Sequence, residues 1–189
     1  MEDLQPRILE IIRSRGIGEG ELEEFLSPKP RLAYDPFLLA NMREGVDLLL
    51  KAVDDANDPV ALHYAYMNLH EFYYTYRDTS PDYLEASKTY ALKDQEILHE
   101  TRRYYIDTEK SRILAYSRLS GSEPEDVSKI DFCYVVPSFS RLSVIYEKEG
   151  DMEKAVKVCD DAVRFYSEVG HKEELAKFMK KRDRLKKKM

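Results

Sequence analysis

The sequence predicts an all-α protein built from antiparallel helix hairpins that stack side by side. Apolar residues recur at intervals of three and four along most of the chain, which is the period of a helix with one buried face. Glycine and proline fall mainly between these segments, and residues 82–119 contain neither. With 189 residues, the chain forms one compact domain or a small domain joined to a repeat array.

Residues 1–57 are expected to form a small helical module. Short helices are expected after Pro6 and at Glu21–Leu26, and a loop follows because prolines occupy positions 28 and 30. A clearer helix follows Pro36, since five apolar residues there step by three and four along one face. These residues are Leu39, Met42, Val46, Leu49 and Val53.

Residues 58–189 are expected to form the repeat domain. Asp58 caps its first helix, with Pro59 in the first turn. Residues 82–119 are either one long helix or two with a break near 102–107. After a loop at 121–124, helices are expected at 137–148 and 152–168, joined through Gly150, and a last helix at about 173–185.

Composition favours a soluble protein of the cytoplasm. Charged residues make up 35% and hydrophobic residues 43% of the chain. No apolar run approaches the ~20 residues that a membrane span requires, and the chain starts without a signal-peptide pattern. The two cysteines, Cys133 and Cys159, belong to no disulfide or metal-binding pattern, which favours a reducing compartment. The net charge of −6 disfavours nucleic acid for the chain as a whole, but leaves room for a local basic patch.

The segment 136–167 carries the strongest repeat pattern. Bulky side chains repeat on its first helix, a glycine occupies the turn, and small side chains repeat on its second helix, where two helices must approach closely. These residues are Phe139, Leu142, Ser143, Tyr146, Gly150, Ala155, Cys159 and Ala162. Their spacing resembles the tetratricopeptide consensus. A looser match begins at Tyr66, so the resemblance implies a short tetratricopeptide-like α–α superhelix over about 60–186.

The tetratricopeptide resemblance implies a partner-binding groove on the first helix of each hairpin. The lysine and asparagine pattern that clamps a C-terminal carboxylate in some relatives is absent. Tyrosine in the groove suits a binding surface, although the same side chains can instead pack between helices. The groove positions are Tyr64, Met67, Glu71 and Tyr74 in the first hairpin, and Ser140, Val144, Glu147 and Lys148 in the last.

Residues 11–53 carry a second resemblance, on the runs Arg15–Ile17, Glu23–Pro28 and Asp35–Leu39. Their order and spacing resemble the segment that precedes the catalytic domain in RecJ-type single-stranded-DNA exonucleases of the DHH family. The catalytic motifs of that family are absent, since no Asp-His-His occurs in the chain and a two-metal nuclease needs a dense cage of carboxylates and histidines. The segment is therefore either a docking module for a DNA-processing partner or a cap on the helical array.

The end of the chain is strongly basic. Its basic residues can contact phosphates, or they can be solvated side chains that favour a helix C-terminus through its dipole. They are Lys180, Lys181, Arg182, Arg184, Lys186, Lys187 and Lys188.

The favoured interpretation is a non-catalytic protein–protein interaction module or scaffold that binds a partner peptide or helix in the tyrosine-rich groove. The alternative is an accessory factor in DNA repair or recombination that binds single-stranded DNA or a DNA-processing enzyme. An enzyme is not expected, because no nucleophile, metal cage or cofactor loop can be identified. No cofactor, no metal ion and no membrane contact are expected, and the sequence does not specify the partner.

Overall fold

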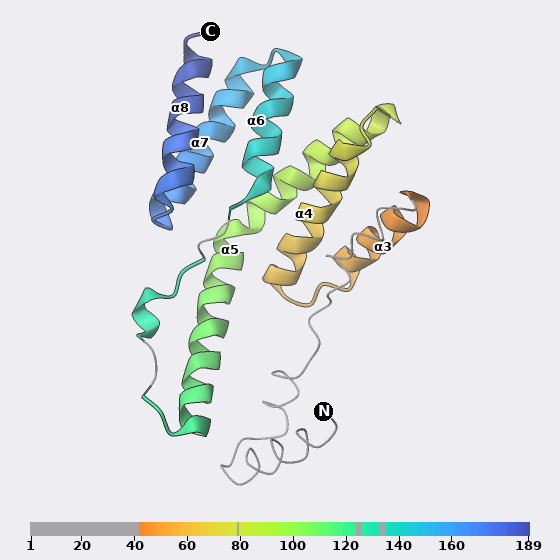
Figure 1. The fold of residues 1–189 in the computed structure, drawn as a ribbon. Coiled ribbons are helices and arrows are strands. Elements are labelled where there is room, and N and C mark those ends of the chain that lie inside the picture. The colour runs from red at the N-terminus through yellow and green to blue at the C-terminus, as the bar shows by residue number, and fades with distance from the viewer. Residues whose placement is uncertain (1–41, 79, 124–125, 133–134) are drawn as a thin grey trace. The chain divides into compact units, whose positions relative to one another are not determined.

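The computed structural model describes residues 42–189 apart from positions 79, 124, 125, 133 and 134 (Figure 1). The described residues are helical and contain no strand, which confirms the all-α class. The chain divides into two compact units, one of residues 1–29 with 105–130 and a larger one of residues 30–104 with 131–189. The helices expected before residue 42, and most of the 11–53 segment, lie outside the described residues.

The larger unit begins with helices α3 (Met42–Asp54) and α4 (Pro59–Thr75), which pack against each other. Leu49, on the apolar face predicted for α3, is buried in one cluster with Leu69 and Phe72 of α4. The N-terminus of α4 is capped as predicted, because the Asp58 carboxylate accepts a hydrogen bond from the Ala61 amide at 2.7 Å.

Helix α5 (Pro81–Ser120) is a single helix, so the alternative with a break near 102–107 is wrong. Its first part packs on α4 in the larger unit, where the Ser87 hydroxyl donates to the His70 carbonyl at 2.9 Å. The rings of Tyr73 and Tyr90 stack, with centroids 5.8 Å apart. These two tyrosines, which are not groove positions, therefore pack between α4 and α5.

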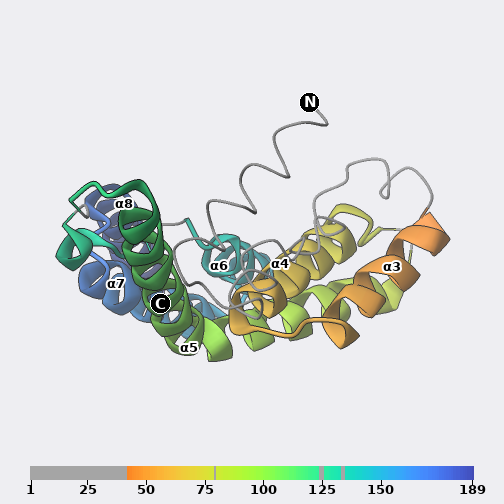
Figure 2. The same ribbon diagram turned by 90° about the horizontal axis from the view of Figure 1, so that it is seen from below.

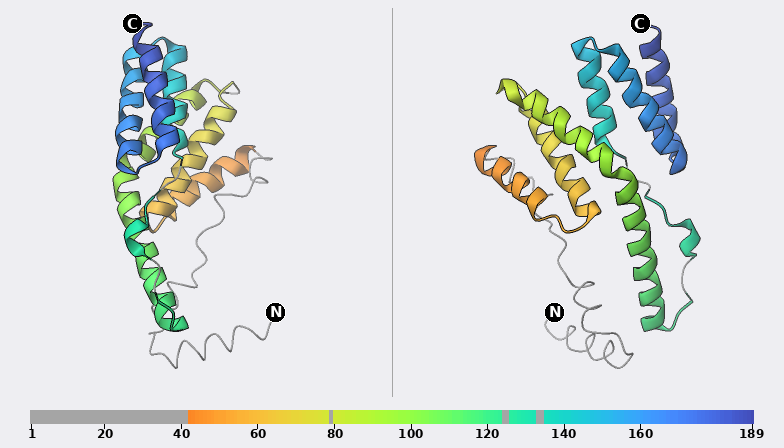
Figure 3. Two further views of the ribbon diagram at one scale, coloured as in Figure 1. Left: turned by 60° about the vertical axis from the view of Figure 1, so that its left-hand side comes forward. Right: turned by 180° about the vertical axis from the view of Figure 1, so that it is seen from behind.

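Helices α6 (Pro137–Glu149), α7 (Met152–Glu168) and α8 (Lys172–Lys186) match the predicted bounds within one residue. Contacts join α6 to α7 and α7 to α8, and Figure 3 shows the three helices side by side. Gly150 ends α6 in the left-handed conformation, at a φ of 79°. Ala155, Cys159 and Ala162 are fully buried on α7, so the small side chains lie where close helix approach was expected.

The described part of the smaller unit comprises the end of α5 and a short 3-10 helix, η3 (Val127–Lys129). Gly121 follows α5 with a φ of 69°, and the Asp126 side chain caps η3. Of the helices in the described part of the chain, none is long and apolar enough to cross a membrane.

Candidate partner-binding surface

One side of α4 carries the four groove residues predicted for the first hairpin. Tyr64, Met67, Glu71 and Tyr74 follow one another at spacings of three, four and three, which places them in one strip along the helix. All four side chains are partly exposed, whereas the side of α4 that faces α3 and α5 is buried. The strip therefore borders solvent along most of the length of α4.

A matching strip runs along α6. The four predicted residues there, Ser140, Val144, Glu147 and Lys148, share the partly exposed side of the helix with Arg141. The opposite side is buried against neighbouring helices. The buried residues of α6 are Ser138, Phe139, Leu142, Ser143, Ile145 and Tyr146.

Helices α4 and α6 lie next to each other in Figure 2, and Arg141 joins their exposed strips. Its guanidinium donates to both carboxylate oxygens of Glu71, with 3.0 Å between Nε and Oε1. The guanidinium carbon also lies 3.8 Å from the centre of the Tyr74 ring, and that of Arg77 lies 4.3 Å from the same ring. The sequence analysis did not single out Arg141, although its place between Ser140 and Val144 puts it on the same side of the helix.

Helix α8 closes the other edge of the surface. The Glu147 carboxylate accepts hydrogen bonds from Arg184 at 2.7 Å and from Lys188 at 2.8 Å. These two cations hold the pKa of Glu147 below its usual value. Lys181, one turn before Arg184 on α8, donates to the Ser143 hydroxyl at 2.6 Å.

The strips of α4, α6 and α8 together make a surface that we name the three-helix face. Contacts between side chains link neighbouring strips from α4 to α6 and from α6 to α8. Its residues are Tyr64, Met67, Glu71 and Tyr74 of α4; Ser140, Arg141, Val144, Glu147 and Lys148 of α6; and Lys181 and Arg184 of α8, with Lys188 just beyond its end.

The basic residues of the tail lie on two sides of α8. Lys181, Arg184 and Lys188 face α6, as described above. Arg182 instead forms an ion pair with Asp160 of α7 at 3.4 Å, and Lys186 approaches the same carboxylate at 3.9 Å. The side chains of Lys180 and Lys187 are exposed. The helix therefore divides the tail's charge between two surfaces.

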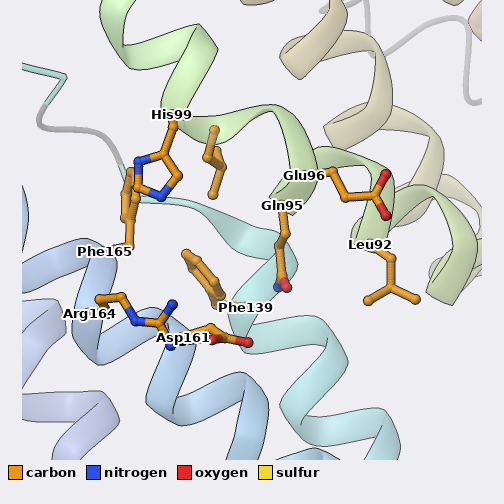
Figure 4. Close-up of a pocket in the computed structure, with 9 residues that line it drawn as sticks. Leu92, Gln95, Glu96, His99, Phe139, Asp161, Arg164 and Phe165 are labelled. Atoms are coloured by element: carbon orange, nitrogen blue, oxygen red, sulfur yellow. Dashed lines mark hydrogen bonds and ion pairs between the residues drawn. The ribbon is translucent and has the colours of Figure 1, made fainter.

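A cavity of about 270 Å³ lies between α5, α6 and α7 (Figure 4). Phe139 and Phe165 supply apolar walls, and the Asp161 and Arg164 side chains pair with each other at 3.1 Å. Gln95 also lines the cavity, and its Nε2 is buried without a hydrogen-bond partner among the described residues. Sequence analysis missed this cavity because its walls come from three helices, whose packing no local pattern predicts.

Two histidines are buried in the α4–α5 hairpin. His63 Nδ1 lies 2.5 Å from Asp94 Oδ1, and both side chains are inaccessible to solvent. His70 is also fully buried, and neither of its ring nitrogens has a hydrogen-bond partner among the described residues. Burial lowers the pKa of His70 to about 4, so the ring is neutral at neutral pH. The contact between His63 and Asp94 joins α4 to α5.

Within the described residues, no group of three or more histidine, cysteine, aspartate or glutamate side chains is placed to hold a metal ion. Cys159 is buried among apolar side chains, and burial raises the pKa of its thiol to about 11. A thiol with such a pKa is a core residue and a poor nucleophile. Cys133 lies outside the described residues.

The candidate site is therefore a set of partly exposed strips on α4, α6 and α8 that side-chain contacts link to one another. Comparison of the chain with models of protein families, with curated proteins and with solved structures found no match.

Proposed function

We propose that the chain is a non-catalytic interaction protein whose three-helix face binds a segment of a partner protein. In this proposal, the hairpins α4–α5 and α6–α7 act as two successive tetratricopeptide-like repeats and α8 caps the array. The glycine turn at Gly150 and the buried small residues of α7 support that assignment, because they are the features that the tetratricopeptide resemblance requires.

The observation that carries the proposal is the junction between α4 and α6. Arg141 contacts Glu71 and Tyr74, so groove residues predicted from two separate hairpins border one continuous surface. A binding groove in a helical repeat array needs this adjacency, because each hairpin alone offers only one narrow strip.

The side chains of the face suit a protein partner. Tyr64, Met67 and Val144 are partly exposed and supply apolar contact area, while charged groups border them on α6 and α8. Tyrosine presents a large area at a low cost in conformational entropy, and methionine adapts to partners of different shape. A partner helix or extended peptide would bury these three side chains and bond to the charged rim.

The experiment compares two methionines. The intact chain is used to capture its partner from the native host, and the captured protein is identified and purified. Met67→Ala should then weaken binding of that protein about tenfold, because the truncation removes apolar contact area from the α4 strip of the face. Met179→Ala is the matched control, since Met179 is 42% exposed on α8 and lies outside the three-helix face. Equal binding by both variants would argue against the face.

The second proposal, an accessory factor in DNA repair or recombination, has less support. The RecJ-like segment lies mostly outside the described residues, and the basic side chains of the tail point to two sides of α8. A salt titration tests it: contacts between the tail and phosphates give an affinity for single-stranded DNA that falls steeply as salt rises. Substitution of the exposed Lys180 and Lys187 tests the tail better than its deletion does. Deletion would also remove Leu185, which is fully buried, and would therefore disturb the fold.

A further inference from the structure

We propose that the partner segment held by the three-helix face is acidic. This inference rests on the proposed function of the face and adds the chemistry of its ligand. The expected ligand is a stretch of protein chain in which carboxylates alternate with apolar side chains.

The charge of the face is opposite in sign to that of the chain. The chain carries a net charge of −6. On the face, the carboxylates are Glu71, which binds Arg141, and Glu147, which binds both Arg184 and Lys188. Because Glu147 can balance only one of its two cations, the face retains positive charge even before Lys148 and Lys181 are considered.

Lys181 is the first of two cations of the three-helix face that lack a carboxylate partner within 4 Å among the described residues. Its ammonium is partly buried between α6 and α8 and donates to a neutral acceptor, the Ser143 hydroxyl. Burial, above all, lowers the pKa of Lys181; the nearby cations Arg184 and Lys177 add to this shift, and the Glu147 carboxylate opposes it. A partly desolvated ammonium without a carboxylate partner gains from an incoming carboxylate, because the opposite charge offsets the cost of its burial.

Lys148 is the second such cation, and it lies on the exposed side of α6. It lies seven positions after Arg141, on the same side of the helix. Lys148 and Lys181 thus mark points on α6 and on α8 where acceptors from a partner would be bound.

Two arginines are held in position beside Tyr74 before any partner binds. The Arg77 guanidinium donates to the Tyr74 carbonyl at 2.7 Å and lies over the Tyr74 ring, which Arg141 also contacts. Arg141 already binds the Glu71 carboxylate, and Arg77 lies 3.7 Å from the Asp78 carboxylate. These two arginines therefore fix the edge of the face beside Tyr74 and leave Lys148 and Lys181 to bind the partner's carboxylates.

A peptide fits this face better than a nucleic acid. Glu71 and Glu147 lie among the cations, and they would repel a backbone that carries a negative charge at every nucleotide. The partly exposed Met67 and Val144 supply apolar area that carboxylate-bearing peptides can cover with their own apolar side chains. Carboxylates spaced along a peptide can meet the cations and avoid the two glutamates.

The test is a selection from a displayed library of random peptides with no charge bias, with the intact chain as bait. Peptides enriched by the chain should contain more Asp and Glu, and less Lys and Arg, than the input. A synthetic copy of the strongest one should bind about tenfold more weakly to the double variant Lys148→Glu/Lys188→Glu. The matched control, Lys157→Glu/Lys172→Glu, changes the net charge equally at exposed positions outside the face and should bind as the unaltered chain does.

The possible outcomes separate the two proposals. Enriched peptides without an acidic bias, but dependent on Met67, would overturn the acidic partner and leave the proposed function standing. If the enriched peptides bind equally well to the parent chain, to Met67→Ala and to the charge-reversal variant, both proposals are wrong. A labelled single-stranded oligonucleotide that displaces the selected peptides and binds more tightly than they do would overturn the peptide in favour of nucleic acid.

Discussion

Arg141 on α6 forms an ion pair with Glu71 on α4, which lies 70 residues earlier in the chain, and the same guanidinium lies over the ring of Tyr74. Both charged side chains are partly exposed, at 25% for Arg141 and 36% for Glu71, so solvent screens the pair. The contact nevertheless links two hairpins, and it combines a bidentate ion pair with a cation–π contact.

Replacement of Arg141 by alanine should lower the free energy of unfolding by about 1 kcal/mol, the sum of a screened ion pair and a cation–π contact. Urea denaturation monitored by circular dichroism measures the change. Arg164→Ala is the control, because Arg164 is 69% exposed and pairs only within α7, with Asp161. If the two variants lose the same stability, Arg141 does not contribute to the junction between hairpins.

Tyr166→Phe should be destabilising even though it removes a single oxygen atom. The Val136 amide donates to the Tyr166 hydroxyl at 2.8 Å, and both residues are fully buried. Loss of the hydroxyl leaves a buried amide without an acceptor, which costs about 1–3 kcal/mol. The thermal unfolding midpoint of this variant should fall well below that of Tyr146→Phe, and equal midpoints would show that the amide finds another acceptor.

Gly150→Ala should cost about 1–2 kcal/mol, because alanine disfavours the left-handed conformation at a φ of 79°. The cost is one of backbone conformation alone, since a Cβ at this position would meet no atom within 4 Å. Gly150→Asn should recover part of the loss, because asparagine tolerates this conformation better. An alanine variant as stable as the parent chain, by urea denaturation, would contradict the assignment of the turn.

The stability of the fold should decrease in mild acid because of His70. Burial depresses its folded pKa to about 4, below the unfolded value of about 6.5, so the unfolded chain takes up the proton first as pH falls. The stabilising contribution is therefore complete above about pH 6.5 and is lost progressively down to about pH 4, by about 3 kcal/mol in all. The charged groups that act on the ring are Asp94 of α5, Glu71 and His63 of α4, and Arg141 of α6.

The variant His70→Leu should remove most of this dependence, because its side chain fills a similar volume and takes up no proton. The measurement is the free energy of unfolding at a series of pH values between 7 and 4 for both proteins, with His99→Leu as the control. His99 is an exposed histidine, at 70%. Identical slopes for the parent chain and the His70 variant would show that other groups cause the acid sensitivity.

Local patterns in the sequence predicted the helices of the described region well. Asp58 and Gly150 mark helix ends because capping and turn formation depend on residues only a few positions apart. The continuity of α5 was left open, since the absence of glycine and proline permits one helix or two. The structure resolves this in favour of one helix.

Contacts between helices could not be predicted in the same way. The contact between Arg141 and Glu71 forms only when two hairpins pack, and that between His63 and Asp94 only when two helices pack. No spacing rule in the sequence connects positions so far apart. The cavity beside Phe139 has the same origin. The placement of the groove residues along single helices was predictable, because a strip on one helix follows from the helical period alone.

The hydrogen bond between His63 and Asp94 joins α4 and α5 at one particular alignment of the two helices. Both groups are enclosed, so sliding one helix by a turn along the other would strand an imidazole and a carboxylate in an apolar interior. We therefore expect this pair to favour one register of α4 against α5. Replacement of both residues by apolar side chains should preserve stability but allow other registers of the two helices, which the native pair disfavours.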